Sequence, residues 1–97
     1  MEFVELTFEW NEEKRASNLA KHGLDFADAY RIFEIPMYVV IDSREDYGES
    51  RYQGIGLLIQ NYVVIVFSEP DEDTIRLISL RRATKLERKI YDSETYF

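Results

Sequence analysis

A set of arginine, tyrosine and acidic side chains interrupts or follows the apolar segments in the second half of the chain. Its members are Asp42, Arg44, Tyr47, Glu49, Arg51, Tyr52, Arg76, Arg81 and Arg82. Arginine binds phosphate groups bidentately, a carboxylate accepts a proton and a tyrosine ring stacks on a base. RNA backbone cleavage needs a base for the 2′-hydroxyl proton, cations for the charge growing on the phosphate, and an acid for the leaving oxygen. The set therefore suggests a site for RNA.

In this interpretation Glu49 is the base, and Tyr47 or Tyr52 stacks on a nucleobase or holds a phosphate oxygen. The arginines of the cationic clamp are Arg44, Arg51, Arg76 and Arg81, and Arg82 follows directly.

A structural interpretation competes with this one. Arg44, Glu49 and Arg51 lie on or next to the loop over residues 43–49, where they would form an ion-pair network. Alternation along the strand predicts that Arg76 shares a face with Ile78 and Leu80. There its stem would lie along the core and its head would reach water or a nearby acid such as Asp42 or Glu49.

Lys21 and His22 end a predicted helix just before Gly23. Cationic side chains stabilise the negative end of a helix dipole, which is a sufficient structural reason for both. His22 is nevertheless the residue best suited to carry a proton near neutral pH, so it remains a candidate general acid.

Other classes of chemistry lack their motifs. The sequence has no glycine-rich phosphate loop, no Gly-x-Ser-x-Gly motif and no His-Glu-x-x-His motif. It contains no cysteine and a single histidine, which excludes a thiolate metal site and a multi-histidine cage. We therefore predict no cofactor and no metal site.

The charge distribution favours a basic partner over nonspecific binding of nucleic acid. Residues 1–50 hold 5 basic and 12 acidic side chains, whereas residues 51–97 hold 7 of each, which gives the chain a net charge of −7. Six basic residues and one acid lie between Arg76 and Lys89, so a small anionic target can still bind there.

The first elements predicted are a strand and two helices. Apolar residues alternate over residues 3–10, as in a half-buried strand. A helix follows, with Asn11 as its N-cap and Gly23 at its end. Asp25 begins a second helix, which stops before Pro36. Its buried face is predicted to carry Phe26, Ala29, Tyr30 and Phe33.

Four further strands and a helix are predicted beyond Pro36. The strands cover residues 37–42, 52–59, 62–68 and 74–80, and short connections between them favour an antiparallel meander. Gly54 and Gly56 indicate a bulge or a close approach by another backbone or a ligand. Thr84 and Glu87 form a capping box before the last helix. We expect one α+β domain over residues 1–97, in the order β-α-α-β-β-β-β-α, with helices on one face of an antiparallel sheet.

The N-terminus carries acids where a signal peptide has basic residues, and no apolar run approaches the roughly 20 residues of a membrane span. We therefore expect a soluble, cytoplasmic protein that does not contact membranes.

Three segments resemble the BrnT toxins of bacterial type II toxin–antitoxin systems. The first comprises residues 8–14, Asn18, residues 21–26 and Ala29. The second runs over residues 42–52 with Ile55 and Gly56, and the third over residues 76–84 with Glu87 and Tyr91. They span nearly the whole chain in the family's order.

The resemblance implies a RelE-like fold and a metal-independent ribonuclease that cleaves RNA and arrests growth. It also implies neutralisation by a cognate antitoxin with a ribbon-helix-helix domain, in a toxin–antitoxin hetero-oligomer that represses its own promoter. DNA would then be contacted only through the antitoxin.

Two other functions remain open at this point. The first is a non-catalytic α+β module whose acidic helices or sheet edge bind a basic protein. The second is a structural dimer that packs through the terminal residues 94–97, which include Tyr96 and Phe97.

Overall fold

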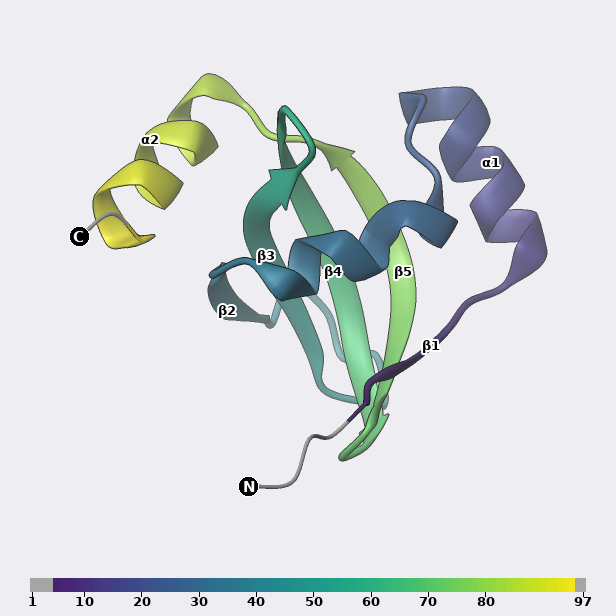
Figure 1. Cartoon of the computed structure of the whole chain (residues 1–97). Helices are drawn as coiled ribbons and strands as arrows, with labels where there is room; N and C mark the ends of the chain where they lie inside the picture. The colour runs from purple at the N-terminus through teal and green to yellow at the C-terminus, as the bar shows by residue number, and fades with distance from the viewer. Residues whose placement is uncertain (1–4, 96–97) are drawn as a thin grey trace.

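The computed structural model describes residues 5–95, and Figure 1 shows how they fold into a twisted sheet with three helical segments around it. The elements are β1 (Thr7–Glu9), α1 (Glu12–His22), η1 (Phe26–Glu34), β2 (Tyr38–Asp42), β3 (Arg51–Leu58), β4 (Asn61–Asp71), β5 (Thr74–Arg82) and α2 (Lys85–Thr95). The predicted start of the first strand at Phe3 and Val4, and the terminal Tyr96 and Phe97, lie outside the described residues. In this part of the chain no helix has the length and apolar character needed to cross a membrane.

The sheet has the order β1-β5-β4-β3-β2 and is mixed. β2 to β5 form the expected antiparallel meander, but β1 runs parallel to β5, with Thr7 opposite Thr74 and Glu9 opposite Arg76. The prediction of a wholly antiparallel sheet is therefore wrong. Short connections constrain only consecutive strands, whereas β1 pairs with a strand that follows it by more than 60 residues.

Local capping signals determine where α1 and α2 begin and where α1 ends. The Asn11 side chain accepts a hydrogen bond from the Lys14 backbone N–H at 3.0 Å, and Gly23 closes α1 in the left-handed conformation, with φ of 71°. Before α2 the predicted capping box is present, because Thr84 and Glu87 exchange hydrogen bonds between side chain and backbone.

The buried amide of Asn18 satisfies the edge of β5 where β1 has ended. Its Nδ2 donates to the carbonyl oxygens of Leu80 at 2.8 Å and Leu24 at 3.1 Å, and its Oδ1 accepts from the Leu80 N–H at 3.1 Å. The amide thus pairs with both backbone groups of Leu80, as a neighbouring strand would. α1 consequently lies alongside β5, in the place where a longer β1 would continue the sheet.

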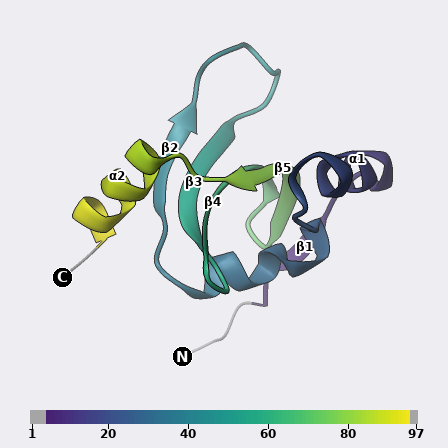
Figure 2. The same ribbon diagram turned by 90° about the horizontal axis from the view of Figure 1, so that it is seen from above.

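The two faces of the sheet are covered by different helices. η1 packs over one face, called here the η1 face, whereas Tyr91 of α2 packs with Ile55 and Val64 on the other, the α2 face. In Figure 2 the loop between β2 and β3 projects on the side of the sheet away from η1. The prediction that the helices share one face is therefore wrong. Alternating side chains of β3 and β4 are apolar on both sides, so both faces need a cover.

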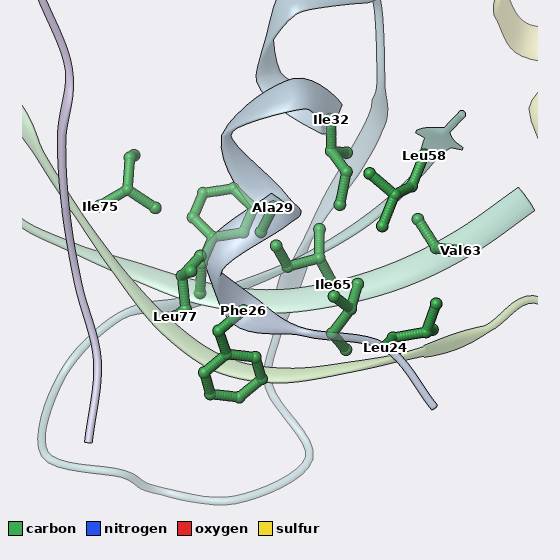
Figure 3. Packing of buried hydrophobic residues seen from close by; sticks show 11 residues of the cluster. Leu24, Phe26, Ala29, Ile32, Leu58, Val63, Ile65, Ile75 and Leu77 are labelled. Atoms are coloured by element: carbon green, nitrogen blue, oxygen red, sulfur yellow. The ribbon is translucent and has the colours of Figure 1, made fainter. Parts of the chain in front are cut away.

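The second helix, η1, is a 3-10 helix rather than an α-helix. With three residues per turn its buried face carries Phe26, Ala29 and Ile32, which Figure 3 shows pointing into the core. Tyr30, which an α-helical period places on this face, is 44% exposed. The predicted face was therefore correct for Phe26 and Ala29, correct also for Phe33, which is partly buried and packs against the core, and wrong for Tyr30.

Gly54 and Gly56 allow η1 and the segment after it to approach β3 closely. A Cβ atom on Gly56 would come within 2.8 Å of the Ile32 side chain, and one on Gly54 within 2.9 Å of Met37 Sδ. Both registers of β3 run without interruption through these positions. The prediction of a bulge is therefore wrong, and the close approach is made by side chains rather than by another backbone or a ligand.

A register shift in β5 changes the predicted orientation of Arg76. Ser79 pairs with Val66, but Leu77 pairs with the next residue, Phe67, so that Ile78 is left between two pairs. Arg76 therefore faces away from the buried Leu80, and the prediction that the two share a face is wrong.

We expect Asn18→Ala to lower the free energy of unfolding by about 2–4 kcal/mol, because both backbone groups of Leu80 and the Leu24 carbonyl lose a buried partner. Urea unfolding measures the change, and Ser17→Ala at the exposed neighbouring position is the control. Equal stability of the two variants would contradict this role of Asn18.

Candidate functional site

A row of polar side chains crosses the whole sheet on the α2 face. Asp42 lies opposite Arg51, Arg51 opposite Ser68, Ser68 opposite Arg76, and Arg76 opposite Glu9. Residues directly opposite on neighbouring strands point to the same side, with Cα atoms about 5 Å apart. Five strands thus bring together two arginines, two carboxylates and a hydroxyl that are scattered from residue 9 to residue 76.

Glu49 lies between the two arginines of this row. Its Oε1 is 3.4 Å from Nη1 of Arg76, and its Oε2 is 4.0 Å from Nε of Arg51. Arg76 also pairs with Glu9 at 2.8 Å, although 46% of its side chain stays exposed. The structure therefore brings together three of the predicted site residues, and the Glu49 carboxylate occupies the position between two guanidinium groups.

Asp42 holds the loop that carries Glu49. Its carboxylate, of which only 2% is exposed, accepts two hydrogen bonds of 2.7 Å from Arg44 and one of 3.4 Å from the Tyr47 hydroxyl. The hydrogen bonds from Arg44 keep the pKa of Asp42 below its ordinary value despite burial. The Arg51 guanidinium lies 4.0 Å from the centre of the Tyr47 ring. The Tyr47 ring thus helps to position Arg51, and the Arg51 guanidinium covers part of the face of the ring.

Arg81 lies on the same face as Arg51, further along β5, and is held by α2. Its two Nη atoms donate to the Glu87 carboxylate at 2.8 and 2.9 Å. This bidentate pair lowers the pKa of Glu87 to about 2 and raises that of Arg81. The positive charge of Arg44 opposes this rise in the pKa of Arg81.

Two predicted residues point away from this cluster. Tyr52 pairs with Phe67 on the η1 face, and the two rings pack with their centres 5.6 Å apart. Arg82 follows Arg81 on β5, so its side chain points to the opposite face of the sheet. It donates a hydrogen bond to the Asn61 side chain, beside the turn between β3 and β4. We leave both out of the site.

Lys21 and His22 lie in a separate hollow at the end of α1. It has a volume of about 280 Å³ and is also lined by Lys14 and Ser79. Ser79 belongs to β5, between Arg76 and Arg81, and points to the α2 face. The hollow therefore adjoins the strand that carries two arginines of the cluster, although His22 makes no hydrogen bond to them within the described residues.

Three residues of the site were not predicted. Glu9 pairs with Arg76, Ser68 lies between the two arginines, and Trp10 lines a hollow of about 320 Å³ beside Arg76 with Glu9 and Asn11. Ser68 directly follows the apolar residues 63–67. A single hydroxyl at the end of this apolar run is the only sign of its role that the sequence offers. The sequence predicts a strand that contains Glu9 and Trp10, but only the pairing of β1 with β5 brings this segment to Arg76.

Comparisons with known proteins support one family. Residues 10–87 match the family model described as the ribonuclease toxin BrnT of the type II toxin–antitoxin system. The fold is similar to the crystal structure of the Brucella abortus ribonuclease toxin BrnT, with a TM-score of 0.64 and 28% identity over 82% of this chain and 99% of that one. No curated protein shows a significant match. Among residues 5–95 no group of three or more His, Cys, Asp or Glu side chains is arranged to hold a metal ion.

The Arg81–Glu87 pair predicts a pH-dependent contribution to stability. Because the pKa of Glu87 is about 2 in the folded chain and 4.5 ordinarily, the contribution is complete above pH 4.5 and is lost as the pH falls through 2. Glu87→Gln keeps a side chain that can cap α2 but removes the charge. The stability gap between the wild type and Glu87→Gln should therefore narrow between pH 5 and pH 2.

Urea unfolding at a series of pH values measures this gap, and Glu94→Gln, at an exposed position of α2, is the control. A gap that stays constant over this range would show that the ion pair does not stabilise the folded chain.

Proposed function

The chain belongs to the BrnT family of ribonuclease toxins of type II toxin–antitoxin systems, and on this basis we propose that it cleaves RNA at the Glu49–Arg51–Arg76 cluster without a metal ion. The observation that carries the proposal is the carboxylate of Glu49 between two arginines, one of them half-exposed, on a polar row across the sheet. A phosphodiester that binds these arginines would meet the carboxylate at the reacting centre.

In this proposal Glu49 accepts the proton of the RNA 2′-hydroxyl. The freed oxygen attacks the adjacent phosphorus, the bond from phosphorus to the 5′-oxygen breaks, and the products are a 2′,3′-cyclic phosphate and a 5′-hydroxyl. Only one third of the Glu49 side chain is exposed, and its loop is anchored through Asp42. The loop that carries the base is therefore fixed before RNA binds.

The arginines supply the positive charge that the pentacoordinate transition state needs. Arg51 and Arg76 flank the phosphate, and Arg44 and Arg81 extend the positive region along the strand of RNA. Each arginine is already oriented by a carboxylate or by Tyr47, so little rearrangement accompanies the reaction. His22, in the hollow beside Ser79, is the residue we propose to protonate the leaving 5′-oxygen, with Lys21 binding a neighbouring phosphate.

We further propose that a cognate ribbon-helix-helix antitoxin neutralises the chain in the cytoplasm and binds the hollow between β1 and η1. This hollow measures about 320 Å³ and is lined by apolar or aromatic residues: Leu6, Phe8, Trp10, Phe26, Ala27 and Tyr30. Glu5, Glu9 and Asp28 neighbour these residues in the sequence, in a half of the chain with a net charge of −7. A basic antitoxin segment with one large apolar side chain complements this surface.

We expect Arg76→Ala and Glu49→Gln each to reduce RNA cleavage at least 100-fold, because one removes a cation at the phosphate and the other removes the base. The assay follows a single-stranded RNA with the purified chain in EDTA. Arg31→Ala, an exposed arginine on η1 at the opposite face, is the matched control. Growth and RNA integrity after induction in bacteria test the same variants in cells.

Folded Arg76→Ala and Glu49→Gln variants with full activity would exclude this site while leaving the ribonuclease intact. A folded wild-type chain without ribonuclease activity would favour the non-catalytic module that binds a basic partner.

The antitoxin interface makes a separate prediction. Tyr30→Arg places a bulky cation in the apolar hollow and should weaken co-purification with the antitoxin at least tenfold, without changing cleavage of RNA. Leu86→Arg on exposed α2 is the control. Undiminished binding by Tyr30→Arg would place the interface elsewhere.

A further inference from the structure

Two neighbouring hydrogen-bond donors at the centre of the polar row have no partner within the described part of the chain. They are Nε of Arg51 and Oγ of Ser68, and both atoms are buried. Ser68 is only 2% exposed, and it lies directly opposite Arg51 in the register of β3 and β4. Among residues 5–95 no other buried side-chain nitrogen or oxygen lacks a partner. The two unsatisfied groups are therefore adjacent and on the same face.

The charged residues nearest to these two donors are the two arginines of the row and Glu49. Arg76 lies opposite Ser68 on its other side, so the hydroxyl stands between two arginines. The nearest Glu49 oxygen is 4.0 Å from Nε of Arg51, too far for a hydrogen bond. The carboxylate thus neutralises part of the charge but leaves both donors unsatisfied.

Such a pair is costly unless a ligand completes it. A buried donor without a partner destabilises a fold by about 1–3 kcal/mol. Most buried polar groups in native proteins therefore have a hydrogen-bond partner. An oxyanion would accept hydrogen bonds from both donors and would be attracted by both guanidinium groups. A tetrahedral phosphate has enough oxygens to contact Arg51, Ser68 and Arg76 together.

We propose that Ser68 Oγ and Arg51 Nε form the floor of a phosphate site, which binds a non-bridging oxygen of the RNA backbone when the Glu49 side chain turns from the guanidinium groups toward the 2′-hydroxyl. This inference rests on the proposed function and extends it, because it adds Ser68 as a binding residue. Glu49 occupies part of the same positive region in the free chain, so RNA phosphate and the Glu49 carboxylate compete for Arg76 and Arg51.

Ser68→Ala tests the proposal with two readouts that move in opposite directions. Since the hydroxyl has no partner in the described chain, its removal should leave the urea midpoint unchanged or raise it. Affinity for inorganic phosphate, and for an RNA made uncleavable by 2′-O-methyl groups, should fall about tenfold, because a hydrogen bond to a charged oxygen is lost. Ser93→Ala on α2 is the matched control and should change neither quantity.

NMR of the Arg51 Nε–H group identifies the site directly. Titration with inorganic phosphate should shift this signal in the wild type and shift it less at the same phosphate concentration in Ser68→Ala. Glu49→Gln should bind phosphate more tightly than the wild type, because its uncharged side chain no longer competes for the arginines.

The outcomes separate this inference from the proposed function. Phosphate binding that depends on Ser68, in a chain that cleaves no RNA, would support the site and overturn the ribonuclease proposal. Active ribonuclease whose phosphate affinity is unchanged in Ser68→Ala would overturn the inference and leave the function standing. A loss of stability in Ser68→Ala would show a structural hydroxyl and would also overturn it.

Discussion

The pairing register of the five strands determines where each charged side chain of the site lies. In the observed register the polar row from Asp42 to Glu9 lies on the α2 face, whereas Tyr52, Phe67 and Leu77 lie on the η1 face. A slip of one residue would exchange the two rows and place arginines in the apolar core, at a cost far above the stability of a small domain. Close packing of Ile32 and Met37 over the glycines of β3 opposes such a slip. The apolar core thus specifies the polar site on the opposite face.

The outer edge of β5 also determines which residues lie next to the site, because two different elements pair with its backbone. β1 covers only the start of this edge, which brings Glu9 to Arg76, and the amide of Asn18 covers Leu80 further along. The hydrogen bonds of Asn18 hold α1 against β5. Lys21 and His22, at the end of α1, therefore line one hollow together with Ser79. Satisfying the backbone of one strand therefore brings Glu9 to Arg76 and also places the end of α1 beside the same strand.

The acidic composition of the chain is compatible with a phosphate site because the cations are concentrated and paired. Glu9, Glu49, Asp42 and Glu87 each hold an arginine, and these pairs orient guanidinium groups that would otherwise be mobile. Preorganised charge stabilises a transition state more than the same charge on flexible side chains. The other acids of the first half include Glu5 and Asp28, which neighbour in sequence the residues that line the apolar hollow between β1 and η1.

The sequence by itself determined the features that depend on residues within one turn or one strand. The caps at Asn11, Gly23 and Asp25, the capping box of Thr84 and Glu87, the four consecutive strands and the arginines worth testing belong to this class. Tertiary structure decided the parallel pairing of β1, the 3-10 period of η1, the shift at Ile78 that turns Arg76 to the α2 face, and the placing of Ser68 between two arginines. Local signals act through hydrogen bonds between near neighbours. These other features follow from how distant apolar surfaces fit together, and one chain's residue pattern does not specify that fit.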